Sequence, residues 1–133
     1  MKEEATAVRI LYAEDDALLR ISTVLLLESK CPGCNITAVD DGEACLEVFQ
    51  SNPGDFDLIL TDKDMPGMSG IELIEHLAET AQNMDIPQII LYTGDLGGAV
   101  ISEKAKEALN IAILSKPTDR NKLIQLVTDM ISQ

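Results

Sequence analysis

The sequence has no tryptophan and only two phenylalanines and two tyrosines in 133 residues, so its core must be aliphatic. Basic residues are also scarce: 10 lysines and arginines stand against 23 acidic residues, which gives a formal net charge of −13. This balance argues against direct binding of nucleic acid or an anionic membrane, because both are bound through clustered basic side chains. It favours a protein that binds cations or meets basic patches on its partners.

Long apolar runs are missing too. No stretch approaches the roughly 18 uninterrupted apolar residues of a membrane span, and the start "MKEEATAVRI" lacks the apolar segment of a signal peptide. We therefore expect a soluble, cytoplasmic protein with no membrane association. The length suits a single domain over residues 1–133, with its core at about 8–131.

Cysteine occurs three times, so complete pairing is impossible. Cys31 and Cys34 form "CPGC", which could be a redox pair or half of a zinc site completed by Cys45, His76 or carboxylates. The simpler interpretation is a Pro-Gly turn that carries two thiols. Cys45 and His76 lie in helical patterns, where we expect a buried thiol and a solvated or packed imidazole.

Short apolar runs alternate with helical patterns along the chain. The runs are rich in Ile, Val and Leu, as in strands covered on both faces. They comprise Val8–Ala13, Ile36–Val39, Phe56–Thr61, Gln88–Tyr92 and Ile111–Leu114. The helical patterns comprise Ala17–Ser29, Gly42–Ser51, Gly70–Gln82, Ala99–Leu109 and Asp119–Ile131, and the candidate caps are Asp16, Asp41, Ser69 and Asp119. Five β-then-α units predict an α/β fold with a doubly wound parallel sheet between two layers of helices.

Ligands of such sheets bind beyond the carboxyl ends of the strands. Polar residues follow four of the five predicted strands at that end. They are Glu14, Asp15 and Asp16; Asp62, Lys63 and Asp64; Thr93, Gly94 and Asp95; and Ser115, Lys116 and Pro117. The sequence therefore predicts a polar site at one end of the sheet.

The residue types in this set indicate phosphoryl chemistry. Carboxylates from two strand ends, at Glu14/Asp15 and Asp62, would repel each other without a cation, and oxygen ligands favour Mg²⁺, Mn²⁺ or Ca²⁺ over zinc. Thr93 and Lys116 could hold an anionic group beside that metal. A phosphoryl group fits, and Asp62 could accept it as an aspartyl phosphate.

The sequence resembles the receiver domains of two-component response regulators, from about Val8 to the C-terminus. The segments that carry the resemblance are "ILYAEDDALLR" (10–20), "DDGEACLEVF" (40–49), "DFDLILTDKDMPGMSGIEL" (55–73), "IILYTG" (89–94) and "ILSKP" (113–117). The resemblance implies a flavodoxin-like (βα)5 sandwich with strand order 2-1-3-4-5. It also implies a signalling phosphoacceptor that catalyses only its own phosphorylation and dephosphorylation.

By this resemblance Asp62 is the phosphoacceptor. Mg²⁺, which Mn²⁺ could replace, would be held by Asp15, Glu14, Asp62 and the backbone carbonyl of Asp64. Thr93 would bind a phosphoryl oxygen and move on phosphorylation.

Lys116 would pair with the same phosphoryl group. The Lys116-Pro117 bond is the candidate for the cis peptide common in the family.

Several positions depart from the family pattern. Ile113 stands where an aromatic switch residue is frequent, Thr118 where Phe is common, and Gly94 where Ala is usual. Asp64 and Asp95 occupy the two positions that, in the family, tune phosphoryl hydrolysis. Two extra carboxylates there should strengthen cation binding and repel an incoming phosphoryl dianion.

The resemblance implies a histidine kinase or histidine phosphotransfer protein as donor, a downstream protein partner and possible homodimerisation. The chain could be a stand-alone regulator or one domain of a longer regulator or hybrid kinase. The Leu-rich pattern at 17–29 suggests either deep burial between helices or a docking surface for the donor. We expect Lys63 at the surface above the site.

Two other functions fit parts of the pattern. The Asp62–Asp64 pair also resembles the Asp-x-Asp of haloacid-dehalogenase-like phosphatases, but the acidic pair at 14–15 lies upstream instead of following the lysine. A pseudo-receiver that is never phosphorylated is the other alternative, and the intact Asp/Asp/Thr/Lys set speaks against it.

Overall fold

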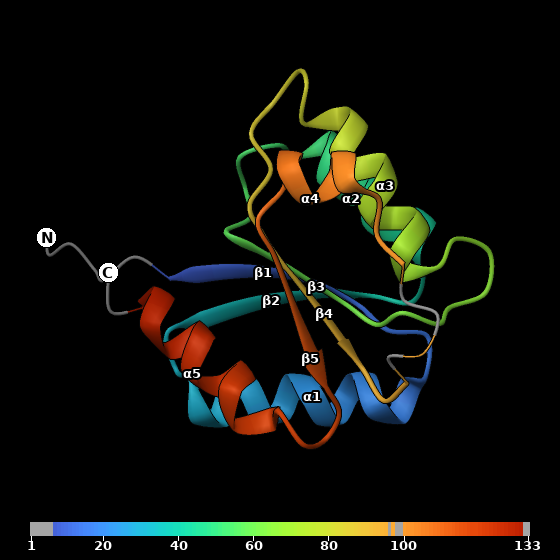
Figure 1. The fold of residues 1–133 in the computed structure, drawn as a ribbon. Helices are drawn as coiled ribbons and strands as arrows, with labels where there is room; N and C mark the ends of the chain where they lie inside the picture. The colour runs from blue at the N-terminus through green and yellow to red at the C-terminus, as the bar shows by residue number, and fades with distance from the viewer. Residues whose placement is uncertain (1–6, 96, 98–99, 132–133) are drawn as a thin grey trace, which may run out of the picture.

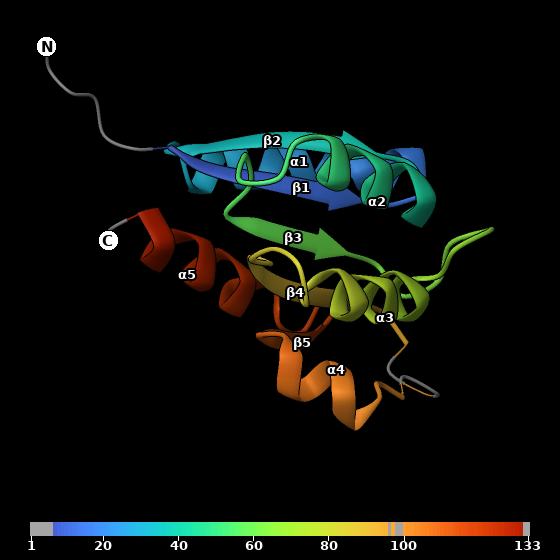
Figure 2. The same ribbon diagram turned by 90° about the horizontal axis from the view of Figure 1, so that it is seen from above.

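Five parallel strands form a single sheet in the order β2-β1-β3-β4-β5 in a computed structural model that describes residues 7–95, 97 and 100–131. The strands are β1 (Val8–Ala13), β2 (Cys34–Val39), β3 (Leu58–Thr61), β4 (Gln88–Thr93) and β5 (Ile111–Ser115). The helices are α1 (Ala17–Lys30), α2 (Gly42–Ser51), α3 (Gly70–Thr80), α4 (Glu103–Ala108) and α5 (Arg120–Ile131). Helices α2, α3 and α4 cover one face of the sheet, and α1 and α5 cover the other (Figures 1 and 2). The predicted fold class and strand order are confirmed.

The sheet is buried on both faces because successive side chains of a strand point to opposite sides. On β1, Leu11 and Ala13 pack into a cluster with α2 and α3, whereas Ile10 and Tyr12 pack into a second cluster with α1 and α5. This double coverage explains why the strands are continuous apolar runs in the sequence.

Most element boundaries fall within two residues of the prediction. Strand β2 begins at Cys34 instead of Ile36, because its backbone pairs with β1 from the Val8–Cys34 register onward, whatever the polarity of its side chains. Helix α4 begins at Glu103, after the capping residue Ser102. Its predicted start at Ala99 lies outside the described residues.

Helix caps agree with the sequence at three positions out of four. Asp16, Asp41 and Ser69 each accept a hydrogen bond from the first turn of the helix that follows. Ser69 also forms a reciprocal capping box with Glu72. Asp119 also stands directly before its helix, α5, but its carboxylate accepts a hydrogen bond from the backbone N–H of Ser115 (2.8 Å), at the end of the preceding strand.

Helix α1 is less buried than its sequence suggests. Leu18, Leu19, Ile21 and Leu25 are exposed, and Leu18 retains 74% of its accessible surface. Leu27 is the one α1 residue that is buried in the core. The interpretation of deep burial is therefore wrong for these four residues, and α1 presents an apolar outer face.

The cysteines are three free thiols in the described chain. The Cys34 N–H donates to the Cys31 carbonyl (3.0 Å), which supports the interpretation of "CPGC" as a turn. Burial raises the pKa of the Cys34 thiol, so the thiolate is disfavoured. Among the described residues, one group has ligand atoms placed for a metal. It is the acidic cluster described below, and it includes no cysteine. His76 is exposed.

Among the described residues, none of the helices has the length and apolar character needed to cross a membrane.

Candidate phosphorylation site

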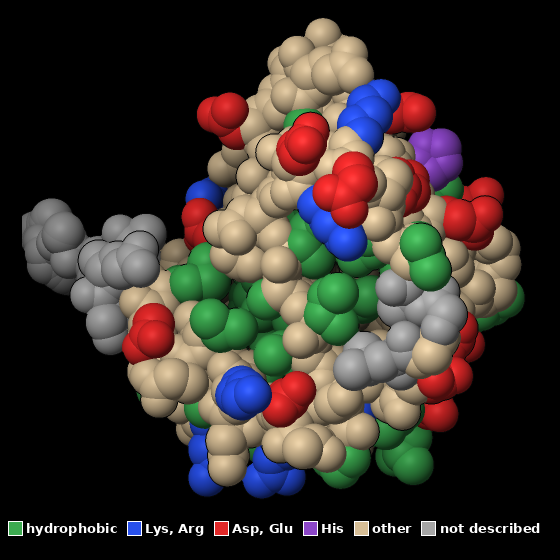
Figure 3. Space-filling view, viewed as in Figure 1, with side chains coloured by type: hydrophobic (Ala, Val, Ile, Leu, Met, Phe, Trp, Pro, Cys, Tyr) green, Lys and Arg blue, Asp and Glu red, His purple; other side chains and the backbone are tan. Residues whose placement is uncertain are grey.

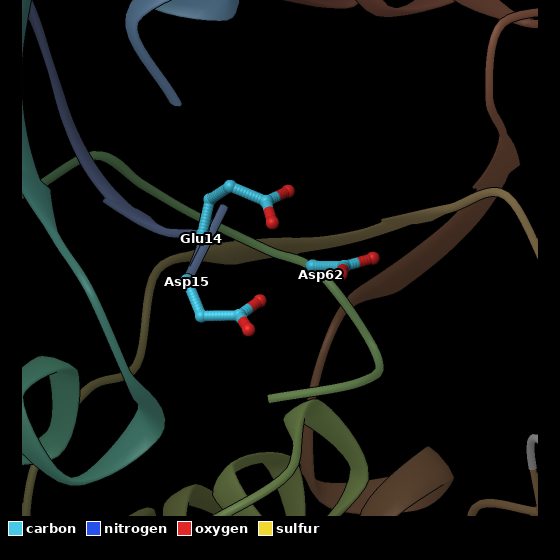
Figure 4. A group of neighbouring side chains, drawn as sticks. All are labelled: Glu14, Asp15 and Asp62. Atoms are coloured by element: carbon cyan, nitrogen blue, oxygen red, sulfur yellow. The ribbon is translucent and has the colours of Figure 1, made fainter. Parts of the chain in front are cut away.

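Three carboxylates converge at the carboxyl ends of β1 and β3. Glu14 and Asp15 follow β1, Asp62 follows β3, and the two strands are paired in register up to Ala13 and Thr61. Each carboxylate places an oxygen within 4.8 Å of the others. Figure 4 shows Glu14 and Asp15 directed toward the side on which Asp62 lies.

Lys116 supplies the positive charge in this group. Its Nζ donates to Glu14 Oε1 at 2.9 Å and lies 3.5 Å from Asp62 Oδ1. The same Nζ lies 5.6 Å from the centroid of the Tyr92 ring. Lys116 therefore bridges carboxylates from two strands.

Burial and pairing act in opposite directions on the pKa values of Glu14 and Lys116. Glu14 is only 1% exposed, and this burial raises its pKa, although hydrogen bonds from Lys116 and from the Asp16 N–H (3.1 Å) act in the opposite direction. For Lys116, burial alone would lower the pKa. The hydrogen bond to Glu14 and the charge of Asp62 outweigh that effect, so the net shift is upward and the ammonium stays charged at neutral pH.

The turn after Asp62 is shaped by two glycines. Gly67 has φ +77°, a left-handed conformation that glycine adopts without strain. Gly70, the first residue of α3, packs against the Asp62 carbonyl so closely that a Cβ there would overlap the oxygen, and its N–H donates to the Lys63 carbonyl (2.8 Å). The backbone that carries Asp62 is thus held directly by the start of α3.

Thr93 lies across the site at the end of β4. It is buried, and its hydroxyl accepts a hydrogen bond from the Asp95 N–H (3.2 Å). The Lys116 N–H donates to the Thr93 carbonyl (2.8 Å), which continues the β4–β5 ladder to the edge of the site. The Lys116–Pro117 peptide bond is cis.

A groove of about 870 Å³ runs from this site along α1. Asp62, Thr93 and Lys116 line one end, and Leu19 and Leu25 of α1 line its apolar wall. A separate hollow, of about 340 Å³, is lined by Asp15 and by Asp64, which also lines the groove. Asp62 is therefore reachable from an apolar surface.

Lys63 is not at the surface, contrary to the sequence interpretation. It retains 7% of its accessible surface, and its Nζ donates to the Gly97 carbonyl (2.6 Å). The same ammonium lies 3.9 Å from Asp64 Oδ2 and 3.7 Å from Asp95 Oδ2. Gly97, which is remote in sequence, thus supplies a hydrogen-bond partner for the buried Lys63 ammonium, a group whose charge favours solvent.

The three other departures from the family pattern are exposed residues. Gly94 is exposed and has open space where a Cβ would be, so alanine would fit. Ile113 on the edge strand β5 is 44% exposed. Thr118 is exposed in the turn before α5.

One contributor to the site gave no signal in the sequence. Arg20 of α1 donates from Nη1 to the Glu14 carbonyl (2.8 Å) and thereby ties the helix to the acidic loop. An arginine in a helical pattern is ordinary, and its partner is a backbone atom, so residue types alone could not identify this contact.

Comparison with known proteins agrees with this geometry. The model of the response regulator receiver domain matches residues 10–128. The two-component response regulator-like protein APRR5 of Arabidopsis thaliana is 35% identical over 121 residues, which are 90% of this chain and 21% of APRR5. The receiver protein CpdR of Brucella abortus is 32% identical over 123 residues, covering 92% of this chain and 96% of CpdR.

A solved structure gives the same result. The response regulator TrrA of Thermotoga maritima, in complex with Mg²⁺-BeF, matches with a TM-score of 0.71 and 26% identity over 92% of this chain and 98% of that one. The chain spans less than two thirds of the length of several curated relatives. Fold, site geometry and sequence together show that the chain belongs to the response regulator receiver domain family, the signalling modules of two-component systems.

Proposed function

We propose that Asp62 accepts a phosphoryl group from a phosphohistidine donor with the help of Mg²⁺, and that this switches a protein-interaction surface. In the transfer, the phosphorus–nitrogen bond of the donor breaks, a bond forms between phosphorus and an Asp62 carboxylate oxygen, and the imidazole leaves with the electron pair. The observation that carries this proposal is the convergence of Asp62 with two further carboxylates and Lys116. A carboxylate beside oxygen ligands for a cation and beside an ammonium suits phosphoryl transfer, since charge neutralisation dominates its catalysis.

The donor set fits Mg²⁺. Asp15 is exposed beside Asp62, Glu14 adds a buried carboxylate, and Asp64 would contribute its backbone carbonyl, so all ligands are hard oxygens. Mn²⁺ could use the same oxygens. The bound metal would offset the negative charge that Asp62 and the phosphoryl group bring together.

Thr93 and Lys116 are assigned to the phosphoryl oxygens. Lys116 is already charged and 3.5 Å from Asp62, which places an ammonium beside the acceptor. The Thr93 hydroxyl donates to the Asp95 carbonyl (3.4 Å), so it must give up that bond to donate to a phosphoryl oxygen. This exchange would transmit phosphorylation to the segment after β4.

Beryllofluoride, a non-covalent phosphoryl mimic, tests the acceptor without chemical turnover. With Mg²⁺ and beryllofluoride we expect the amide resonances of Asp62, Thr93, Gly94 and Lys116 to shift in NMR spectra of the wild type. The Asp62→Ala variant should show no such shifts, because the bond partner is lost. A wild-type spectrum that does not respond would favour the pseudo-receiver alternative.

The exposed apolar face of α1 is proposed as the docking surface of the histidine kinase or histidine phosphotransfer protein. It borders the groove that leads to Asp62, so a partner seated there would bring its phosphohistidine to the acceptor. The exposed side chains of this face are leucine and isoleucine, so affinity for water does not explain why they are exposed. Large exposed apolar patches of this kind mark interaction sites.

Replacing Leu18 by glutamate is expected to slow phosphotransfer from a histidine phosphotransfer protein that labels the wild type, by about tenfold, because a charge must then be buried at the interface. A carboxylate in the first turn of α1 is compatible with the helix dipole, so folding should be kept. Val100→Glu is the matched control, since Val100 is equally exposed and precedes α4. Equal rates for the two variants, measured by radiolabel transfer, would refute docking on α1.

A second surface suits the downstream partner or a homodimer. Figure 3 shows apolar side chains gathered over β5 between α4 and α5, with acidic side chains at the end where β1 and β3 terminate. Ile113 is the exposed apolar residue of β5. Because β4 and β5 are paired from Ile89 to Thr93, a shift at Thr93 would reach this face directly.

The remaining assignments concern the extent of the domain, its location and the alternative functions. We assign residues 1–133 to a single receiver domain in the cytoplasm, where free thiols such as the three described here stay reduced. The phosphatase alternative is weakened by Asp64, whose carboxylate is 71% exposed and lies 3.9 Å from the Lys63 ammonium. No direct contact with nucleic acid is proposed.

A further inference from the structure

Lys63 is a buried lysine that the proposed phosphoryl chemistry does not use. Its side chain is 9% exposed, whereas Asp64 and Asp95, the two carboxylates beside its ammonium, are 71% and 74% exposed. A lysine is rarely buried unless it is paired. The arrangement therefore places the cation inside and its two counter-ions at the surface.

The partners of Lys63 come from two different segments. Asp64 belongs to the turn after β3, while Asp95 and Gly97 follow β4. The hydrogen bond to the Gly97 carbonyl (2.6 Å) fixes the ammonium, and Asp95 Oδ1 in turn accepts from the Gly97 N–H (2.9 Å). Lys63 thus ties the segment after β4 to the turn after β3, which begins with Asp62.

Both carboxylates lie at the mouth of the acceptor groove. Asp64 and Asp95 line the same groove as Asp62, Thr93 and Lys116. Unpaired, two carboxylates at this point would repel a phosphoryl donor, which arrives as a dianion. A single ammonium between them, at 3.9 and 3.7 Å, offsets part of that repulsion.

We propose that Lys63 is a positioning residue for phosphorylation: it holds Asp64 and Asp95 in place and offsets part of their negative charge, so that an anionic phosphoryl donor can approach Asp62. This inference rests on the proposed function of Asp62. Lys63 is assigned no contact with the phosphoryl group or the metal, and its ammonium is placed by Gly97, Asp64 and Asp95. Its effect passes through the two carboxylates, and this makes it separable from a purely structural role.

The test is the initial rate of labelling by acetyl phosphate with Mg²⁺, followed by intact mass. In this reaction the phosphorus–oxygen bond to the acetyl group breaks, a bond to an Asp62 oxygen forms, and acetate leaves. Lys63→Met should be labelled about fivefold more slowly than the wild type at low salt. Lys106→Met makes the same charge change at an exposed site on α4 and should alter the rate less than twofold.

Four further measurements separate charge from structure. The deficit of Lys63→Met should shrink as ionic strength rises, because added salt screens exposed charges. Adding Asp64→Asn and Asp95→Asn to Lys63→Met should restore the wild-type rate, and Lys63→Arg should retain most of it. Asp95→Asn alone keeps Lys63 and should be labelled faster than the wild type, which keeps the inference testable if Lys63→Met does not fold.

The outcomes distinguish failure of the proposed function of Asp62 from failure of the role of Lys63 alone. A wild-type protein that gains no phosphoryl mass would overturn the proposed function itself. A labelled wild type with Lys63→Met at the same rate would overturn the role of Lys63 alone. So would a deficit that persists unchanged in the triple variant, since the effect would then not pass through Asp64 and Asp95.

Discussion

Lys116→Met is expected to slow labelling of Asp62 by acetyl phosphate at least about 100-fold, the scale seen when one preorganised charge partner of a transition state is removed. Lys116 bridges Glu14 and Asp62, at 2.9 and 3.5 Å. Its loss leaves the acceptor and the arriving phosphoryl group without their protein cation. Methionine preserves most of the side-chain volume, so packing against Tyr92 is kept.

The same variant should bind Mg²⁺ more tightly, by about fivefold, because a positive charge has been removed beside the metal ligands. Loss of transfer together with a gain in metal affinity is a pattern that general unfolding cannot produce. Lys122→Met on α5 is the matched control: its ammonium is exposed and pairs with Asp119 at 3.5 Å. If Lys116→Met were labelled at the wild-type rate, or bound Mg²⁺ more weakly in calorimetric titration, the assignment of Lys116 would be wrong.

Gly70→Ala should destabilise the protein by about 2–4 kcal/mol, because a new methyl group would overlap backbone that cannot move freely. The nearest atom is the Asp62 carbonyl oxygen, and the Lys63 backbone lies 3.0 Å away. Either α3 or the acceptor loop must shift. Labelling of Asp62 should therefore fall together with the free energy of unfolding in urea.

Gly94→Ala is the appropriate comparison for that experiment. It lies at the same site, but nothing is found within 4 Å of its Cβ position. Its unfolding free energy should stay within about 0.5 kcal/mol of the wild type. Equal stability of Gly70→Ala and Gly94→Ala would show that the close approach at Gly70 does not constrain the loop.

Much of the fold is readable from the sequence because it depends on local patterns. Strand β1 and helix α2 have the predicted boundaries, since an apolar run and a capped helix each carry their own signals. Strand β2 extends beyond its apolar part because its start is decided by backbone pairing with β1. The exposure of α1 is not predicted for a related reason. An apolar helix face indicates that the face is covered, but it does not indicate whether this chain or a partner protein covers it.

The residues of the site also differ in this respect: some are predicted from their place after a strand, and others depend on contacts with segments remote in sequence. Glu14, Asp15, Asp62 and Lys116 were placed together because each follows a parallel strand, and parallel strands end at one edge of the sheet. The burial of Lys63 is not predicted from the sequence, because it depends on a carbonyl 34 residues away, at Gly97. No residue type at position 97 signals such an acceptor, since every residue has a backbone carbonyl.

The central claim is that Asp62 is the phosphoacceptor. Its most direct test is the intact mass of the full chain after incubation with acetyl phosphate and Mg²⁺. The wild type should gain ~80 Da, the mass of one phosphoryl group. Asp64→Asn should gain the same mass, while Asp62→Ala, or the wild type with Mg²⁺ chelated, should gain nothing. An unchanged wild-type mass, or a gain that survives in Asp62→Ala, would contradict the account.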